Sequence, residues 1–182
     1  MRPRVRYAVL GGARVIRATI CFLIGHEPRR VLLGLKKRGF GRGKYNGFGG
    51  KIADGEDARD AAVREIREEC GLEVASTDLV PAGRLTFIFP FCPEFDHDVE
   101  VFRVATWRGE PRESDEMRPE WFPIEEIPYD CMWEDDGHWL PLVLDGAVVE
   151  AEFAFAADNE TVSRFSLRTI PPESPTVPRP GT

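Results

Sequence analysis

The chain has 182 residues, and its 42% apolar content is enough to fill the core of one domain. Its net charge of −7 argues against a protein that binds a nucleic acid polymer, because a surface for the phosphate backbone should be basic. No apolar run reaches the roughly 18 residues of a transmembrane helix, so no membrane partner is expected.

The cysteines and the two ends of the chain bear on compartment and domain limits. The four cysteines form no C-x-x-C pair, and the three histidines complete no zinc-binding spacing. A reduced, cytoplasmic protein is expected, with nuclear and mitochondrial pools left open. Residues 1–13 lack a continuous apolar segment and are interpreted as an extension rather than a signal peptide. The domain is predicted over residues 14–170, and the Pro-rich tail over 171–182 is predicted to be disordered.

The chain before the first helix is predicted to begin with a β-hairpin. Residues 15–24 and 31–35 are apolar and β-branched, and they flank a turn at residues 26–28. Residues 36–44 then form a loop with five cations and three glycines, which is either a solvated loop or one that presents cations and N–H groups to phosphates. We favour the second interpretation because a carboxylate-rich helix follows.

That helix is predicted over residues 56–70. It follows two turn signals, GFGGK at 47–51 and Asp54-Gly55, and apolar residues then recur at helical spacing. Gly71 is a suitable residue to end it. On this helix Glu65, Glu68 and Glu69 share one face, where they repel one another unless a hard divalent cation binds. A carbonyl of the Gly-rich turn would add a ligand, whereas the alternative is a solvated acidic surface.

The second half of the chain contains mainly strands. Alternating or aromatic patterns predict strands at residues 84–91, 97–107, 121–122, 147–155 and 161–167, with the end of a second helix at 140–144. Residues 73–80 are expected to be irregular, and 113–117 to form an acidic loop. Strands that alternate with two helices predict an α/β (α+β) fold with a mixed sheet between helices.

The stretch 50–72 resembles the complete Nudix box, G-x5-E-x7-R-E-U-x-E-E-x-G-U, where U is apolar. Its fixed positions are Gly50, Glu56, Arg64, Glu65, Ile66, Glu68, Glu69, Gly71 and Leu72. The resemblance implies the Nudix fold and the Mg²⁺-dependent hydrolysis of a nucleoside diphosphate linked to another group, with Mn²⁺ as a substitute cation. Residues 31–51, 113–119 and 132–139 further resemble the oxidized purine nucleoside triphosphatases of animal type, within a similarity that runs from about residue 19 to 167.

This closer resemblance assigns expected roles residue by residue. The expected metal ligands are the carbonyl of Gly49 and the carboxylates Glu65, Glu68, Glu69 and Glu116. For the mechanism, Glu69 is the first candidate for the base or for a ligand that orients the water, Glu65 is the second, and Arg64 is expected to orient the glutamates. The expected substrate contacts are Thr19, Lys36, Phe40, Asn46, Phe48, Gly49, Gly50, Lys51, Phe87, Met117, Trp133, Glu134, Asp135, Asp136 and Trp139. The chain departs from the animal pattern at Tyr45, where Trp is usual, and at His97, where Met is expected.

The chemistry of the expected substrate contacts agrees with binding of a purine base. A flat base gains roughly 1–3 kcal/mol by stacking on an aromatic ring such as Trp133. Asn46, Asp135 and Asp136 offer donors and acceptors for its edge. Because two adjacent buried carboxyls resist double ionisation, one of them is expected to hold a proton. Exchange of this proton between the two carboxyls would let one pocket accept both oxidized guanine and oxidized adenine.

The expected function is therefore the conversion of 8-oxo-dGTP and 2-hydroxy-dATP to monophosphate and pyrophosphate by a monomer. Another Nudix specificity remains open, such as a general dNTP, a methylated purine nucleotide or a nucleotide sugar. A non-catalytic nucleotide sensor is a different class, and the intact set of glutamates argues against it. An mRNA-cap enzyme is disfavoured because no extensive basic surface is evident.

Overall fold

The computed structural model describes residues 15–171, so the predicted extension and nearly all of the predicted tail lie outside the described residues. One sheet has the order β3-β2-β1-β5-β4-β7-β8, and β6 also pairs with β2. The strands are β1 (Ile16–His26), β2 (Arg29–Lys36), β3 (Tyr45–Asn46), β4 (Leu79–Ile88), β5 (His97–Val104), β6 (Met117–Pro123), β7 (Val148–Phe155) and β8 (Val162–Ile170). The β1–β5 and β4–β7 pairs are parallel, so the predicted mixed sheet is confirmed.

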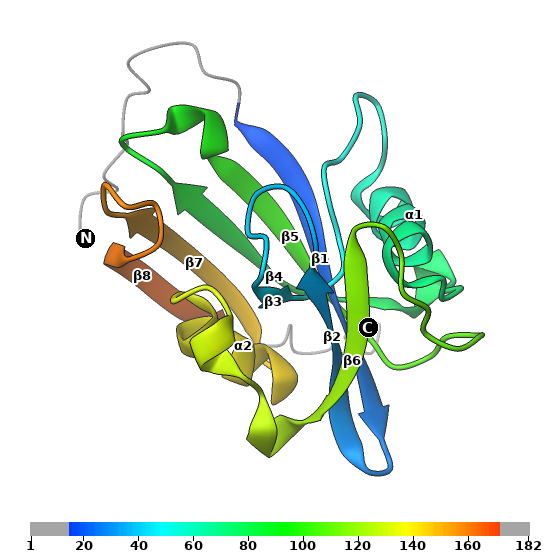
Figure 1. The fold of residues 1–182 in the computed structure, drawn as a ribbon. Coiled ribbons are helices and arrows are strands. Elements are labelled where there is room, and N and C mark those ends of the chain that lie inside the picture. Colours follow the sequence, from blue (N-terminus) through cyan, green and yellow to red (C-terminus); the bar gives the residue numbers. More distant parts are fainter. Residues whose placement is uncertain (1–14, 172–182) are drawn as a thin grey trace, which may run out of the picture.

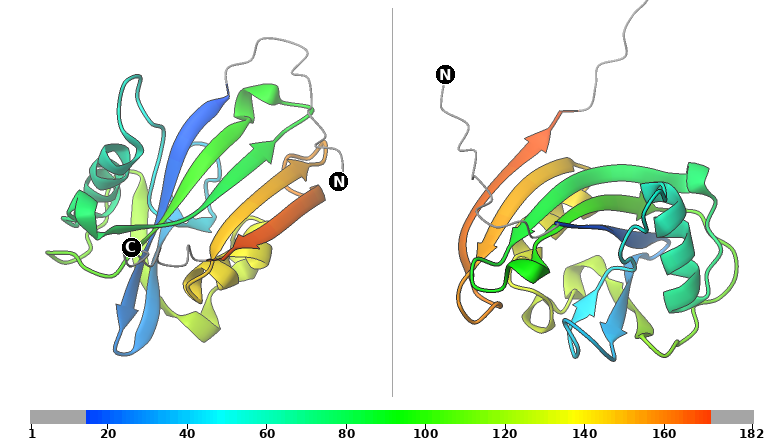
Figure 2. Two further views of the ribbon diagram at one scale, coloured as in Figure 1. Left: turned by 180° about the vertical axis from the view of Figure 1, so that it is seen from behind. Right: turned by 90° about the horizontal axis from the view of Figure 1, so that it is seen from above.

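The helices α1 (Ala58–Cys70) and α2 (Asp136–Leu144) cover opposite faces of this curved sheet (Figures 1 and 2). Strand β1 separates two buried clusters, because its successive side chains point to opposite faces. Phe22 belongs to the cluster that contains the apolar residues of α2, and Cys21 and Leu23 belong to the cluster that contains those of α1. Helices on both faces are therefore confirmed.

The predicted hairpin and first helix are present. β1 and β2 pair antiparallel, with Leu23 opposite Leu32. Helix α1 begins two residues later than predicted, because the Asp57 carboxylate caps it by accepting the Arg59 N–H at 2.8 Å. The helix ends at Gly71, whose φ of 73° is left-handed and therefore suits a residue without a Cβ.

The prediction for β4 was wrong at both ends. The strand begins at Leu79, where the chain was expected to be irregular, because Leu79 pairs with Val104 of β5. It ends at Ile88 rather than at residue 91, since the Phe89 N–H instead donates to the Asp96 carboxylate at 2.8 Å and Pro90 has no N–H. Phe91 is therefore 66% exposed and does not extend the aromatic face of the strand.

Within residues 15–171, neither helix is long and apolar enough to pass through a lipid bilayer. The four cysteines are free thiols, and Cys21 and Cys70 are buried. Burial raises the pKa of Cys70 to about 12, so this thiol is uncharged at neutral pH and packs as an apolar side chain.

Candidate active site

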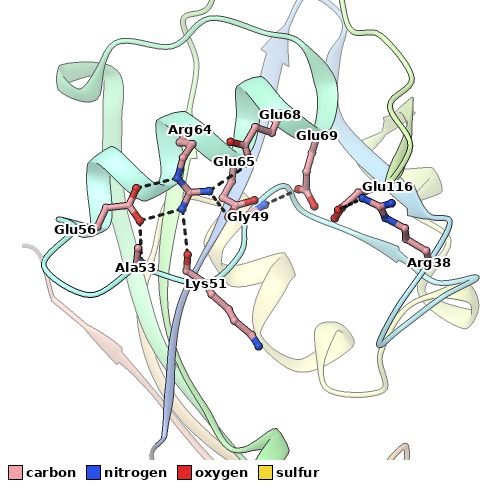
Figure 3. A network of polar contacts seen from close by, with 10 residues as sticks. All are labelled: Arg38, Gly49, Lys51, Ala53, Glu56, Arg64, Glu65, Glu68, Glu69 and Glu116. Carbon is pink, nitrogen blue, oxygen red and sulfur yellow. Dashed lines mark hydrogen bonds and ion pairs between the residues drawn. The ribbon is translucent and has the colours of Figure 1, made fainter.

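Arg64 organises the carboxylates on the exposed side of α1, as Figure 3 shows. Its guanidinium donates to both oxygens of Glu56, at 2.9 and 3.0 Å, and to Glu65 at 2.7 Å. It also reaches Glu68 at 3.4 Å and donates to the Lys51 carbonyl at 3.2 Å. The hydrogen bonds from Arg64 hold the pKa of Glu56 near 2, so this pair stays charged. Arg64 thus fixes the position of Glu65 relative to the Gly-rich turn.

Glu69 lies on the inner side of α1 and is only 3% exposed. Its carboxylate accepts a hydrogen bond from the Gly49 N–H at 2.9 Å. Burial raises the pKa of Glu69 to about 8, while the Gly49 N–H and the charge of Lys36 oppose that rise, and the negative charges of Glu65 and Glu116 add to it. The ionised form of this carboxyl therefore needs a further positive partner.

The Gly-rich turn lies against these carboxylates so closely that side chains are excluded. A Cβ on Gly50 would lie 2.6 Å from an oxygen of Glu65, and one on Gly49 would lie 2.1 Å from the Thr19 carbonyl oxygen. The Gly50 carbonyl accepts from Thr19 N–H and the Phe48 carbonyl from Cys21 N–H. Among the described residues no hydrogen bond goes to the Gly49 carbonyl, so this oxygen is available as a ligand.

Glu116 comes from the loop before β6 and points toward Glu69 in Figure 3, but it forms an ion pair with Arg38. Lys37 ties the same two loops together by donating to Glu113 at 2.7 Å. Within residues 15–171, no three His, Cys, Asp or Glu side chains already converge as a metal-binding group. Arg64 and Arg38 hold three of the candidate carboxylates, Glu65, Glu68 and Glu116, in ion pairs.

A hard divalent cation fits this donor set. Such cations take carboxylate and carbonyl oxygens. The buried Glu69 has a single N–H partner, the Gly49 carbonyl is available, and Glu65 and Glu116 flank them. A bound cation would compensate charges that burial and mutual repulsion now disfavour.

Competition between Arg38 and a cation for Glu116 gives a testable expectation. We expect Arg38→Gln to tighten Mg²⁺ binding about 2- to 5-fold, since the exposed ion pair that competes for Glu116 is weak. Isothermal titration calorimetry of MgCl₂ into wild type and variant would measure it. Arg42→Gln, on the same loop, removes the same charge without breaking an ion pair between described residues and is the matched control. Equal tightening in both variants would indicate a general charge effect instead.

A cavity of about 180 Å³ opens beside the carboxylates, on the α2 side of β1. Lys36, Gly49 and Gly50 line its end nearest α1. Twelve of the predicted substrate contacts line this cavity: Thr19, Lys36, Phe40, Asn46, Gly49, Gly50, Phe87, Met117, Trp133, Asp135, Asp136 and Trp139. These residues come from elements far apart in sequence, so the fold brings the predicted set together.

Three predicted contacts do not line the cavity. Phe48 is fully buried in the cluster under α1, because β1 and the Gly-rich turn pair through its backbone. Lys51 is exposed, and Glu134 accepts a hydrogen bond from the Val162 N–H at 2.6 Å. In this structure the side chain of Phe48 supports the fold, and that of Glu134 joins α2 to the β7–β8 hairpin.

Asp135 and Asp136 are 3% and 2% exposed, and each has one oxygen engaged by the protein. Trp139 Nε1–H donates to Asp135 Oδ2 at 2.9 Å, and the Trp133 N–H donates to Asp136 Oδ2 at 3.1 Å. Burial raises the pKa of Asp135 to about 6 and that of Asp136 well above its ordinary value. Both carboxyls border the cavity, so their remaining oxygens are suited to read a ligand.

Two further polar side chains in the cavity wall are only partly satisfied. Asn46 Oδ1 accepts the Gly47 N–H at 3.0 Å, which leaves its amide NH₂ as a donor. Thr19 Oγ1 is buried and has no hydrogen-bond partner among the described residues. Because a buried unpaired hydroxyl is costly, Thr19 is suited to a polar ligand group.

Trp133 does not present both ring faces to the cavity. Phe40 stacks on it at 4.9 Å between ring centroids, and Lys44 Nζ lies 5.0 Å from the ring centroid. Phe40 also contacts Phe95, at 4.7 Å between centroids, although its side chain is 43% exposed. A base that stacks on Trp133 must therefore use the other face or displace Phe40.

The sequence interpretation missed most of the apolar wall of the cavity, although it singled out His97 as a departure from the animal pattern. The additional lining residues are Ala18, Ile20, Gly47, Leu85, Phe89, His97, Val99 and Phe155. Phe89 and Phe155 stack at 4.6 Å between centroids with 3° between ring planes. The alternation of Leu85, Phe87 and Phe89 was the available signal, but it was used only to predict a strand.

Comparisons with known proteins agree with this arrangement. A family profile described as the NUDIX domain matches residues 14–143. The oxidized purine nucleoside triphosphate hydrolase of Mus musculus is 45% identical over 144 residues, which cover 79% of this chain and 90% of that protein. Its namesake in Danio rerio is 52% identical over 118 residues, covering 65% and 74%. The structure of the mutator MutT protein from Bacillus halodurans matches with a TM-score of 0.73 at 24% identity, over 84% of this chain and 97% of that one, and supports the fold alone.

Proposed function

The chain belongs to the Nudix family of hydrolases, and from this membership we propose that it hydrolyses oxidized purine nucleoside triphosphates, with Mg²⁺ as the working cation and Mn²⁺ as a substitute. The products are the nucleoside monophosphate and pyrophosphate. As a cytoplasmic monomer, it would remove 8-oxo-dGTP and 2-hydroxy-dATP from the nucleotide pool. The names of the mouse and zebrafish relatives support this substrate class.

One observation carries the proposal: a single cavity joins the carboxylate helix to a base-reading wall. Lys36, Gly49 and Gly50 line it beside Glu65 and Glu69, and Asp135 and Asp136 line it elsewhere. A triphosphate extends between these two regions when its base lies against the aspartates. Binding of the base thereby fixes the position of the reactive phosphates relative to the carboxylates.

The residues divide the chemistry between them. Glu65, Glu68, Glu69, Glu116 and the Gly49 carbonyl would hold a divalent cation, which when bound neutralises phosphate charge and activates water. Glu69 accepts the proton of the water that attacks, and the anhydride bond between the α- and β-phosphates breaks. Lys36 binds the phosphates through its ammonium group. Arg64 keeps Glu65 in position through its own bond to Glu56.

The proposal is tested by comparing kcat/KM for 8-oxo-dGTP, 2-hydroxy-dATP and dGTP while measuring pyrophosphate and phosphate separately. We expect pyrophosphate as the product and a preference for the oxidized substrates of at least about 10-fold, the effect of one additional hydrogen bond read by a buried group. A preference for a methylated purine nucleotide or a nucleotide sugar would favour another Nudix specificity. Tight binding with Mg²⁺ and no turnover would favour a nucleotide sensor.

A further inference from the structure

His97 places a polar ring among apolar side chains of the cavity wall. It begins β5, where it lies between Ile16 of β1 and Phe87 of β4 in the sheet. The ring is half-buried and lies parallel to Phe40, with 16° between planes and 6.5 Å between centroids. The wall around it is made by apolar side chains such as Phe89 and Val99.

The backbone fixes which nitrogen of His97 carries the hydrogen. Nδ1 contacts the Phe95 carbonyl, which can only accept, so Nδ1 is the donor. Burial lowers the pKa of His97, and the nearby charge of Lys51 acts in the same direction, against the Phe95 contact and Asp96. The ring is therefore neutral at pH 7, and Nε2 is a hydrogen-bond acceptor. Among the described residues no hydrogen bond to Nε2 is present.

An unmatched acceptor in an apolar wall favours a ligand that brings a donor. In unmodified guanine and adenine, N7 carries a lone pair and no hydrogen. Oxidation at C8 places a hydrogen on N7 and so converts this acceptor into a donor. Oxidation of adenine at C2 leaves N7 as an acceptor.

We propose that His97 is a specificity-determining residue whose Nε2 accepts a hydrogen bond from the N7–H of a purine oxidized at C8. This rests on the proposed function, because it requires a purine base in the cavity. If the base were unmodified, the lone pair of Nε2 would face the lone pair of N7, so the same atom disfavours the undamaged nucleotide. The aspartates remain responsible for the other edge of the base.

Two variants distinguish the effect of the Nε2 acceptor from the effect of the aromatic ring. His97→Phe keeps an aromatic ring without Nε2, and His97→Gln keeps an acceptor oxygen near the place of Nε2. The substrates are 8-oxo-dGTP, 8-bromo-dGTP, which has a C8 substituent but no N7–H, and 2-hydroxy-dATP. We expect His97→Phe to lower the ratio of kcat/KM for 8-oxo-dGTP over 8-bromo-dGTP about 10-fold. His97→Gln should restore part of the ratio. Turnover of 2-hydroxy-dATP, whose N7 is also an acceptor, should not fall in His97→Phe.

An unchanged ratio in His97→Phe would overturn the proposal, as would equal losses on all three substrates. The ratio is internal to each variant, so partial loss of folded protein does not affect it. If wild type hydrolyses none of these triphosphates, the proposed function fails, and tryptophan fluorescence titrations with 8-oxo-dGMP and 8-bromo-dGMP then decide the role of His97. A wild-type preference for 8-oxo-dGMP that disappears in His97→Phe supports it, and its persistence refutes it.

Discussion

Glu69→Gln should lower kcat by about 10²- to 10⁴-fold, the contribution typical of a positioned acid or base. The amide keeps the size of the carboxylate and still accepts the Gly49 N–H through its oxygen. It cannot take a proton from water, and it is a weaker cation ligand. Because burial disfavours the ionised carboxylate, the free energy of unfolding of the variant should be no lower than that of wild type at pH 7.

Kinetics of pyrophosphate release, together with urea denaturation, would check both parts of this expectation. Glu73→Gln, which changes an exposed glutamate just beyond α1, is the control and should behave as wild type. Turnover of Glu69→Gln within a few fold of wild type would remove Glu69 from the mechanism. Glu65, the second candidate, would then be tested by the same substitution.

Asp135→Asn and Asp136→Asn should shift base preference in opposite directions. In each variant the side-chain oxygen takes over the bond to Trp139 or to the Trp133 N–H, and the NH₂ group faces the cavity as a fixed donor. Wild type can instead hold its proton on either buried carboxyl, because close carboxyls resist double ionisation. Each variant therefore locks one of two donor patterns. We expect the ratio of kcat/KM for 8-oxo-dGTP over 2-hydroxy-dATP to change about 10- to 100-fold.

The control is Asp130→Asn, which alters an exposed aspartate in the segment that leads to α2. It should leave the ratio unchanged. Equal losses on both substrates in Asp135→Asn and Asp136→Asn would indicate that the carboxyls only maintain the shape of the pocket. A shift in the same direction in both variants would mean that the proton has one fixed location.

The spacing of a few residues was sufficient to predict the helix that carries the candidate metal ligands. Glu65, Glu68 and Glu69 lie three and four residues apart, so helix geometry alone places them together. The cap at Asp57 and the left-handed Gly71 are also local, and the helix was placed within two residues at its start. Local chemistry of this kind is readable from sequence.

Contacts between segments far apart in the sequence could not be predicted in this way. Nothing near Arg38 in the sequence indicates a pair with Glu116, because that contact depends on how two loops meet. Residues such as Phe155 and His97 enter the cavity wall through parallel strand pairing, which aligns segments separated by long connections. Resemblance to a family supplied Trp133, Asp135 and Asp136.

Strand β1 separates the two buried clusters, and this separation affects how substrate preference can evolve. Asp135, Asp136 and the rings of Phe89 and Phe155 lie on the α2 side, whereas the residues that support the glutamates lie on the α1 side. Substitutions without shared contacts have additive effects on free energy. Substitutions on the α2 side can therefore change which damaged base is preferred without altering the glutamates that act on the phosphates. Among the apolar side chains, Met117 packs under α1 and also lines the cavity, so a substitution there would alter both regions at once.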